Sequence, residues 1–310
     1  MTLIQTFFSY ERVIQVADRR LTWKDGTVAD DEYTKLVCWN QTFAAGFTGI
    51  SRVDRRGRKP TSEWIAEVLC DFGRFENGVQ ALAQETQNRV SKLNWPEKRL
   101  AIVVAGFDFR GPHIAEISNF NTSTNTSDDL NSFRIRTGHL RPHPHANQVH
   151  SVGVPLKDFE SRLLRERVPR VLRRKDGLNR AIKLMVENQR RVHRYKGDVA
   201  GLVGCDAQVI TIPRIQDGGP RGVVMSNMDG TDLSPRSSGF VYFDRKGFQY
   251  KQIGPLSASG GFVIDSLLGE ANPDSPDDMS ISWRYVKTPP AWQRRRAARD
   301  SRRGSRSDST

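Results

Sequence analysis

Thr2 stands directly after the initiator methionine, and sixteen residues later the chain reads Asp18-Arg19-Arg20-Leu21-Thr22. A methionine that precedes a residue as small as threonine is normally removed, which leaves the threonine with a free α-amine. The ordinary pKa of an α-amine is about 7.7 to 8.0, so this group can accept a proton near neutral pH. Thr2 alone then supplies a nucleophile and a base, and the acidic and basic cluster at 18–22 is expected one strand pair away.

The elements that must position Thr2 follow from the hydrophobic pattern. Strands are predicted over 2–8, 12–17, 33–39, 42–47, 100–107, 114–120, 132–137, 148–152 and 206–212. The strands at 132–137 and 148–152 are expected to extend the sheet that contains 100–107 and 114–120. Helical spacing occurs over 64–93, with a break near Asn77-Gly78, and over 157–196, with interruptions near Pro169 and Gly177.

This order predicts an α+β fold in which two antiparallel sheets pack together with helices outside each. The domain built in this way covers residues 1–212. Residues 213–285 are predicted to form an accessory β segment, with a hairpin over 239–242 and 248–252. Residues 286–310 form an Arg/Ser-rich tail without periodic apolar residues, and we expect this tail to be disordered.

The composition favours a soluble protein. The 310 residues are 37% hydrophobic, which is enough for a substantial core. No apolar run approaches the roughly 18 residues that a membrane span requires, and no secretory signal pattern opens the chain. We therefore expect a cytoplasmic protein without membrane contact. Cys38, Cys70 and Cys205 lie too far apart for a disulfide framework or a CxxC metal pair, and they are predicted to be core residues.

One histidine-rich segment could in principle hold a metal ion. His139, His143, His145 and His150 lie close together, and the His-x-His spacing suits zinc or nickel. No acidic residue or cysteine is near them in sequence, so a solvated loop is favoured over a metal site. We expect neither a metal nor another cofactor.

The net charge of +13 is concentrated in two segments, of which 157–196 carries +9 and 291–310 carries +5. The rest of the chain is close to neutral. Such basic segments fit RNA, DNA or an acidic partner protein, although solvated helix faces and subunit contacts produce the same composition. A polyanion-binding or nucleic-acid-binding module is therefore one alternative for the function.

Several short motifs together carry a resemblance to a known family. They are Thr2 with Asp18-Arg19-Arg20-Leu21-Thr22, Lys35-Leu36-Val37, Ala45-Gly46-Phe47-Thr48-Gly49, Gly106-Phe107-Asp108 followed by Pro112, and Asp206-Ala207-Gln208-Val209-Ile210-Thr211. In this order the chain resembles a proteasome β-type subunit of the N-terminal-nucleophile (Ntn) hydrolase superfamily, especially its bacterial proteasome-type members. The resemblance covers roughly residues 2–212 as a fold pattern. It implies a four-layer αββα sandwich, here with a C-terminal β extension and a basic tail.

The resemblance also implies roles for particular residues. The Thr2 hydroxyl would attack a carbonyl carbon while the Thr2 amine takes the proton. Lys35 would supply positive charge and Asp18 would orient Lys35. The Gly46 N–H would face the oxyanion, and Asp198 falls on the late aspartate of the family's catalytic site. Thr22 is expected to bind the backbone of a substrate, although a β-favouring surface threonine is equally natural there.

Two positions depart from the family pattern. Val154 and Gly201 stand where that family has serines that help hold the amine and its proton-transfer water. The predicted function is a threonine-type amide hydrolase, most readily a peptidase, that works as a homo-oligomer on a peptide or other amide. The departures support a first alternative, a catalytically inactive structural or assembly subunit. Whether an unfoldase acts with the protein is left open.

Overall fold

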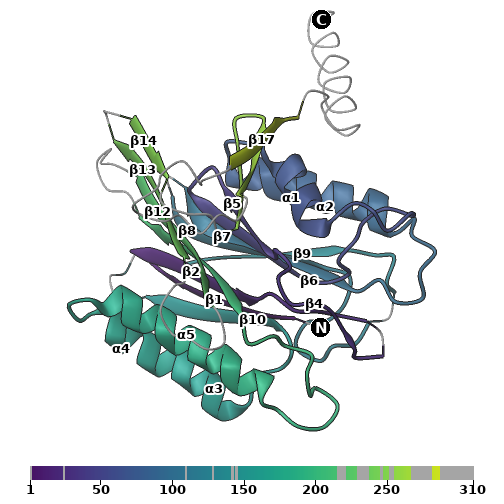
Figure 1. Ribbon diagram of the computed structural model, residues 1–310, viewed down its shortest axis with the longest axis horizontal. Helices are drawn as coiled ribbons and strands as arrows, with labels where there is room; N and C mark the ends of the chain where they lie inside the picture. The colour runs from purple at the N-terminus through teal and green to yellow at the C-terminus, as the bar shows by residue number, and fades with distance from the viewer. Residues whose placement is uncertain are drawn as a thin grey trace, which may run out of the picture.

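The computed structural model describes residues 2–23, 25–108, 110–127, 129–140, 143, 146–214, 221–228, 237–244, 247–250, 255–266 and 281–286. These residues form a mixed α+β fold with two large β-sheets and with helices on the outer side of each sheet (Figure 1). The predicted α+β class is confirmed at this level. Of the predicted tail over 286–310, all but Val286 lies outside the described residues.

The first sheet is built around the amino-terminal hairpin. Within the described ranges it has seven strands in the order β10-β1-β2-β11-β12-β13-β14, and all neighbours are antiparallel. The strands are β1 (Leu3–Ser9), β2 (Arg12–Asp18), β10 (Asn147–Gly153), β11 (Ala207–Pro213), β12 (Arg221–Met228), β13 (Ser237–Asp244) and β14 (Gly247–Tyr250). The predicted placement of 148–152 in the other sheet is wrong, because β10 pairs with β1. A strand's own sequence does not specify its partner.

The second sheet has eight strands among the described residues, in the order β17-β16-β15-β5-β6-β7-β8-β9. The strands are β5 (Leu36–Trp39), β6 (Phe43–Gly49), β7 (Leu100–Asp108), β8 (Gly111–Ser118), β9 (Arg134–His139), β15 (Leu256–Ser259), β16 (Phe262–Ser266) and β17 (Ile281–Tyr285). Only the pairing of β15 with β5 is parallel among these. The residues predicted as an accessory segment therefore add strands to both sheets: β12 to β14 extend the first sheet, and β15 to β17 extend the second.

The core between the two sheets explains why the amino-terminal strands are almost continuously apolar. Ile4 and Phe8 of β1 pack against residues of the second sheet, such as Val103. Phe7, which points to the other side of β1, packs instead against helical residues such as Met185. Successive side chains of a strand point to opposite faces, so a strand covered on both faces needs apolar residues at both sets of positions.

Two groups of helices cover the outer faces of the sheets. Those against the second sheet are α1 (Thr61–Leu69) and α2 (Phe75–Val90). Those against the first sheet are α3 (Asp158–Arg162), the π-helical turn η1 (Leu163–Arg167), α4 (Val168–Leu172) and α5 (Gly177–His193). The π-helical turn directly precedes the turn that contains Pro169, whose missing N–H interrupts the regular hydrogen-bond pattern. In the described part of the chain, no helix is both long and apolar enough to cross a membrane.

The predicted helix break near Asn77-Gly78 is wrong. The helices are separated at 70–74 instead, and Gly78 lies inside α2. A Cβ atom added to Gly78 would lie 2.2 Å from Cη2 of Trp39, so glycine here lets the helix approach the buried indole. A glycine in a helical pattern predicts a break, because the local sequence does not show that another side chain, here the Trp39 indole, packs against the helix backbone.

Replacing Gly78 with alanine should therefore destabilise the protein. In a helix interior this change ordinarily stabilises by about 0.5 to 1 kcal/mol. Here the contact with Trp39 should reverse the sign and cost about 1 to 3 kcal/mol, as overpacking in a core does. Urea unfolding of Gly78→Ala checks the sign, and the double variant with Trp39→Phe should recover part of the loss. A stabilised Gly78→Ala protein would contradict this packing.

Candidate functional site

Thr2 lies immediately before β1 and is held by the backbone of the neighbouring strand. Only 4% of the surface of Thr2 is exposed to solvent. The Thr2 carbonyl accepts a hydrogen bond of 3.0 Å from the N–H of Val154. Gly153 has φ +99° and passes so close that an added Cβ would lie 1.6 Å from the Thr2 carbonyl oxygen. Glycine at 153 is thus required both by its conformation and by the closeness of Thr2.

Lys35 precedes β5, and its ammonium group is completely buried beside Thr2. Its Nζ donates to Thr2 Oγ1 at 2.6 Å, to Asp18 Oδ2 at 3.0 Å and to the carbonyl oxygen of Arg20. A lysine ammonium has three N–H donors, so these three acceptors satisfy it completely. This arrangement suits a charged lysine.

Asp18 ends β2 and faces Lys35 as a completely buried carboxylate. Besides Lys35, three backbone N–H groups donate to it: Leu3 at 2.8 Å, Arg20 at 3.0 Å and Gly204 at 3.1 Å. A buried charge is tolerated when it is paired and its remaining lone pairs accept hydrogen bonds. The aspartate therefore joins the start of β1, the end of β2 and the segment before β11 at one point.

The electrostatics of the cluster favour transfer of the Thr2 hydroxyl proton. Burial lowers the pKa of Lys35 from its ordinary value because the ammonium loses hydration, and the Asp18 carboxylate opposes this shift. Since Lys35 donates to Thr2 Oγ1, the hydroxyl oxygen acts as an acceptor in that bond and its own hydrogen remains available. A positive charge next to the oxygen also stabilises the alkoxide that forms when the proton leaves.

Gln208 is a supporting residue that the sequence motifs did not single out for a role. It lies on β11 and is 1% exposed. Its Oε1 accepts hydrogen bonds from the backbone N–H of Lys35 at 2.8 Å and of Leu36 at 3.3 Å, which fixes the entry of the chain into β5. A glutamine among the apolar and β-branched residues of this strand was the available signal.

The structure brings Thr2, Asp18 and Lys35 together and places the other predicted residues elsewhere. Gly46 lies in the middle of β6, paired with Leu36 on one side and Val103 on the other. The N–H of a residue in an interior strand points along the sheet toward a neighbour, so the oxyanion role predicted for Gly46 gains no support from this position.

Asp198 and Thr22 also lie outside the hydrogen-bonded cluster. Asp198 is exposed in the turns that follow α5, and Thr22 is half-buried in β3 (Leu21–Thr22), which pairs with β4 (Val28–Asp30). Thr48 lies on the same side of Gly153 as the Thr2 backbone: a Cβ added to Gly153 would lie 3.3 Å from Thr48 Oγ1 and 1.6 Å from the Thr2 carbonyl oxygen. The end of β6 therefore lies near the Thr2 carbonyl group.

Replacing Gly153 with alanine should damage the site and the fold together. The left-handed backbone and the contact with Thr2 should together cost roughly 2 to 5 kcal/mol. Gly201→Ala is a matched control, since Gly201 has φ +72° but no atom within 4 Å of an added Cβ. That control should show the conformational cost alone, about 1 to 2 kcal/mol, in urea unfolding. Equal losses in the two variants would contradict the close approach of Gly153 to Thr2.

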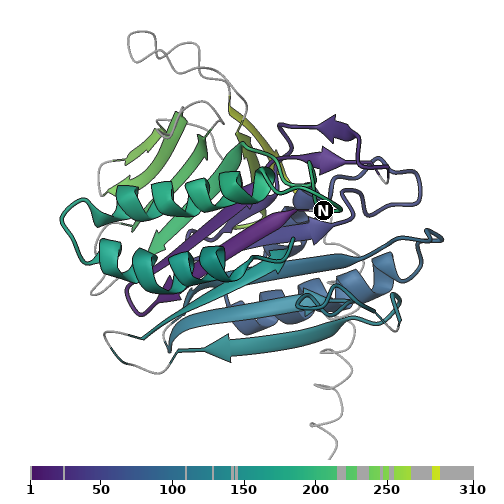
Figure 2. The same cartoon turned by 90° about the horizontal axis from the view of Figure 1, so that it is seen from below.

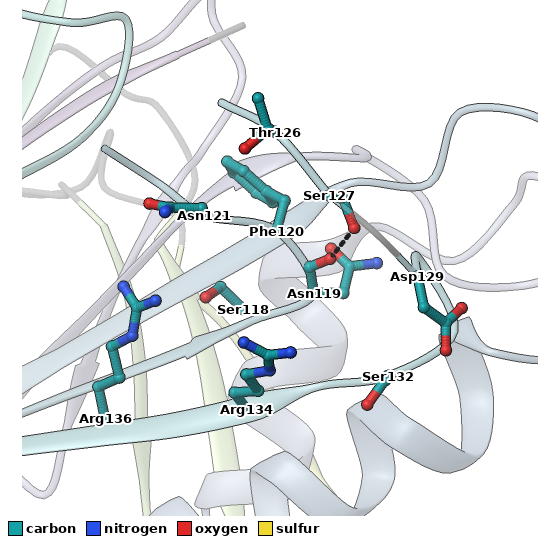
Figure 3. A pocket seen from close by; sticks show the side chains of 10 residues that line it. All are labelled: Ser118, Asn119, Phe120, Asn121, Thr126, Ser127, Asp129, Ser132, Arg134 and Arg136. Atoms are coloured by element: carbon teal, nitrogen blue, oxygen red, sulfur yellow. Dashed lines mark hydrogen bonds between the residues drawn. The ribbon is translucent and has the colours of Figure 1, made fainter. Parts of the chain in front are cut away.

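A separate pocket of about 160 Å³ lies at the end of β8 and β9, and none of the clustered residues line it (Figure 3). Arg134 and Arg136 of β9 point into it, and Phe120 forms part of its wall. The hydroxyls of Ser118 and Ser127 are already used, since they donate to Glu116 and to the Asn119 carbonyl. The residues that line this pocket form no arrangement of nucleophile and charge comparable to the one around Thr2.

Within the described ranges, no group of three or more His, Cys, Asp or Glu side chains is placed to hold a metal ion. Of the histidine-rich segment, His145 lies outside those ranges. His150 Nε2 lies 2.9 Å from Glu116 Oε2, so this histidine has a partner across the two sheets. No protein-family model matches the chain, and no curated protein matches it at a significant level.

Proposed function

We propose that this protein is a threonine-type Ntn amide hydrolase, most readily a peptidase, with Thr2 as its nucleophile after removal of Met1. The observation that carries the proposal is the 2.6 Å contact between Lys35 Nζ and Thr2 Oγ1, in a cluster completed by Asp18. A lysine and an aspartate with no exposed surface are rarely assembled around a threonine for stability alone, because desolvation costs several kcal/mol per ion. The two facing sheets with outer helices support the αββα sandwich of this superfamily.

The proposed reaction is acyl transfer in two steps. Thr2 Oγ attacks the substrate carbonyl and its proton passes, directly or through water, to the Thr2 amine. Lys35 stabilises the negative charge on Oγ, and Asp18 keeps Lys35 charged and in place. The C–N bond then breaks, the leaving amine takes the proton, and an ester to Thr2 remains. Water hydrolyses the ester, with the Thr2 amine as base.

A specific observation favours a second candidate, a catalytically inactive subunit of the same fold. Val154 is buried in an apolar cluster with Leu3, Val192 and Val203. Gly201 has open space where a side chain would extend. The hydroxyls that the family pattern places at these two positions therefore have no equivalent here. In either case we propose a homo-oligomer, which size-exclusion chromatography with light scattering can test.

Intact mass after incubation with a peptide epoxyketone tests the proposal. This electrophile requires both the hydroxyl and the free amine of an N-terminal threonine. We expect a protein without Met1 that gains one adduct, whereas Thr2→Ala should gain none. A wild-type protein that loses Met1 and never gains mass would support the inactive subunit. Retention of Met1 would reject the peptidase.

A further inference from the structure

The layer formed by α3, η1, α4 and α5 has a strongly basic outer surface. Figure 2 shows these helices side by side over the first sheet, with their outer side facing the viewer. Every lysine and arginine of residues 157–196 is exposed except Arg190, which is 4% exposed. The apolar residues of α5, such as Ile182, Met185 and Val186, pack inward. The outer surface is therefore left to the charged side chains.

Most of the exposed charges of this layer form no ion pair with another residue that the structure describes. Among the exposed basic residues of the layer, ion pairs with described residues reach only Arg191 and Arg194, at 4.0 and 3.8 Å, and both involve Glu187. The exposed acidic residues of the layer are Asp158, Glu166 and Asp176. Two copies of such a surface repel each other, so a partner of opposite charge fits better than a second copy of this chain.

We propose that this helical layer binds the phosphate backbone of double-stranded nucleic acid without sequence preference. A duplex presents one negative charge per about 1.7 Å of its axis, so a stretch as long as the 17-residue α5, roughly 25 Å, carries about fifteen phosphate charges in all. Arginine and lysine side chains supply most such contacts, and nucleic-acid interfaces are polar and strongly basic. The inference is independent of the proposed hydrolase activity.

Other anionic partners fit the surface less well. Interfaces with proteins carry aromatic or aliphatic anchors at their centre. An interfacial membrane helix needs an exposed apolar face. Single strands need aromatic side chains for stacking. Among the large apolar side chains of this layer that the structure describes, only Phe159 is exposed, at 51%, and the Arg191 guanidinium lies over its ring at 5.1 Å from the centroid.

Fluorescence anisotropy with a 20-base-pair duplex of arbitrary sequence, the full chain and a series of salt concentrations tests the proposal. The layer variant carries Gln at Arg170, Arg174, Arg180 and Lys183, which are all exposed. The matched control carries Gln at the exposed Arg55, Arg56, Arg58 and Lys92, near the other group of helices. Both variants lose four positive charges, so a difference between them reports position and not net charge.

We expect the layer variant to bind at least about tenfold more weakly at 100 mM salt. Its slope of log K against log salt should fall by about 0.9 for each phosphate that it no longer neutralises. The control should keep the wild-type slope and change affinity less than about threefold. A third variant, with Gln for the seven arginines of 291–310, separates the contribution of that segment.

Equal losses of affinity in the layer and control variants would overturn the proposal. So would binding that disappears only in the variant of 291–310, or an absence of duplex binding at 50 mM salt. Tighter binding to a single strand, or retention on anionic vesicles without duplex binding, would also contradict it. Circular dichroism should confirm that each variant is folded, and Thr2→Ala should bind the duplex as the wild type does.

Discussion

Lys35→Met should slow labelling of Thr2 by a peptide epoxyketone by at least about 100-fold, the usual scale for losing a group that assists proton transfer or stabilises charge. Methionine keeps the length and burial of the side chain but removes the ammonium that contacts Thr2 Oγ1 at 2.6 Å. Removal of Met1 should not change, because it depends on the residue after the methionine. The rate of adduct formation, followed by intact mass, gives the comparison.

Lys98→Met is the matched control for this prediction. Lys98 is also a buried lysine, 8% exposed, and its Nζ donates to the carbonyls of Ser91 and Leu93 and to Asn131 Oδ1. This variant should lose stability but label at nearly the wild-type rate when folded. If both variants lost labelling equally, the effect would come from the fold and not from a charge beside Thr2. Full labelling of Lys35→Met would contradict the role of Lys35.

Asp18→Asn should destabilise the protein by about 3 to 5 kcal/mol, the range for breaking a buried ion pair by removal of one partner. The substitution keeps the shape of the side chain. However, it leaves the Lys35 ammonium without a counter-charge. In the wild type both carboxylate oxygens accept hydrogen bonds from backbone N–H groups, so the asparagine NH₂ group, which can only donate, must face at least one of these donors. Urea unfolding, monitored by circular dichroism, measures the loss.

A double-mutant cycle separates the ion pair from the rest of the cluster. The double variant Asp18→Asn with Lys35→Met removes both charges, so it should be more stable than the sum of the single losses predicts, by about 1 to 3 kcal/mol. Additive losses would mean that the two charges do not interact in the folded protein. Labelling should remain low in the double variant, since the ammonium is absent.

The strands around the site were predictable because their apolar runs are long. The predicted strands at 2–8 and 12–17 correspond to β1 and β2 within one or two residues at each end. The sheets are covered on both faces, so the apolar residues of these strands form nearly continuous runs, which are a strong signal in the sequence. The helix break predicted at Gly78 is wrong because the local sequence does not contain the reason for this glycine. Glycine is needed there to make room for the indole of Trp39, which is distant in sequence.

The site was predictable only in part. Thr2 and Asp18 are singled out by their spacing, and Lys35 by the resemblance to the Ntn family. The burial of Lys35 is not expected from the residue itself, because a lysine that opens a strand is usually solvated. Its acceptors include the Arg20 carbonyl, and the donors to Asp18 include the Gly204 N–H. Backbone groups have no signature in a sequence. Spacing also could not show that Gly46 lies in the middle of a strand, between Leu36 and Val103.

Tandem mass spectrometry of the amino-terminal peptide, before and after epoxyketone treatment, shows whether Thr2 is the nucleophile. We expect the untreated peptide to begin at Thr2 and the adduct to bridge the Thr2 amine and hydroxyl in one ring. An amino-terminal peptide that still begins with Met1 would contradict this expectation. An adduct located on any other residue would contradict it equally.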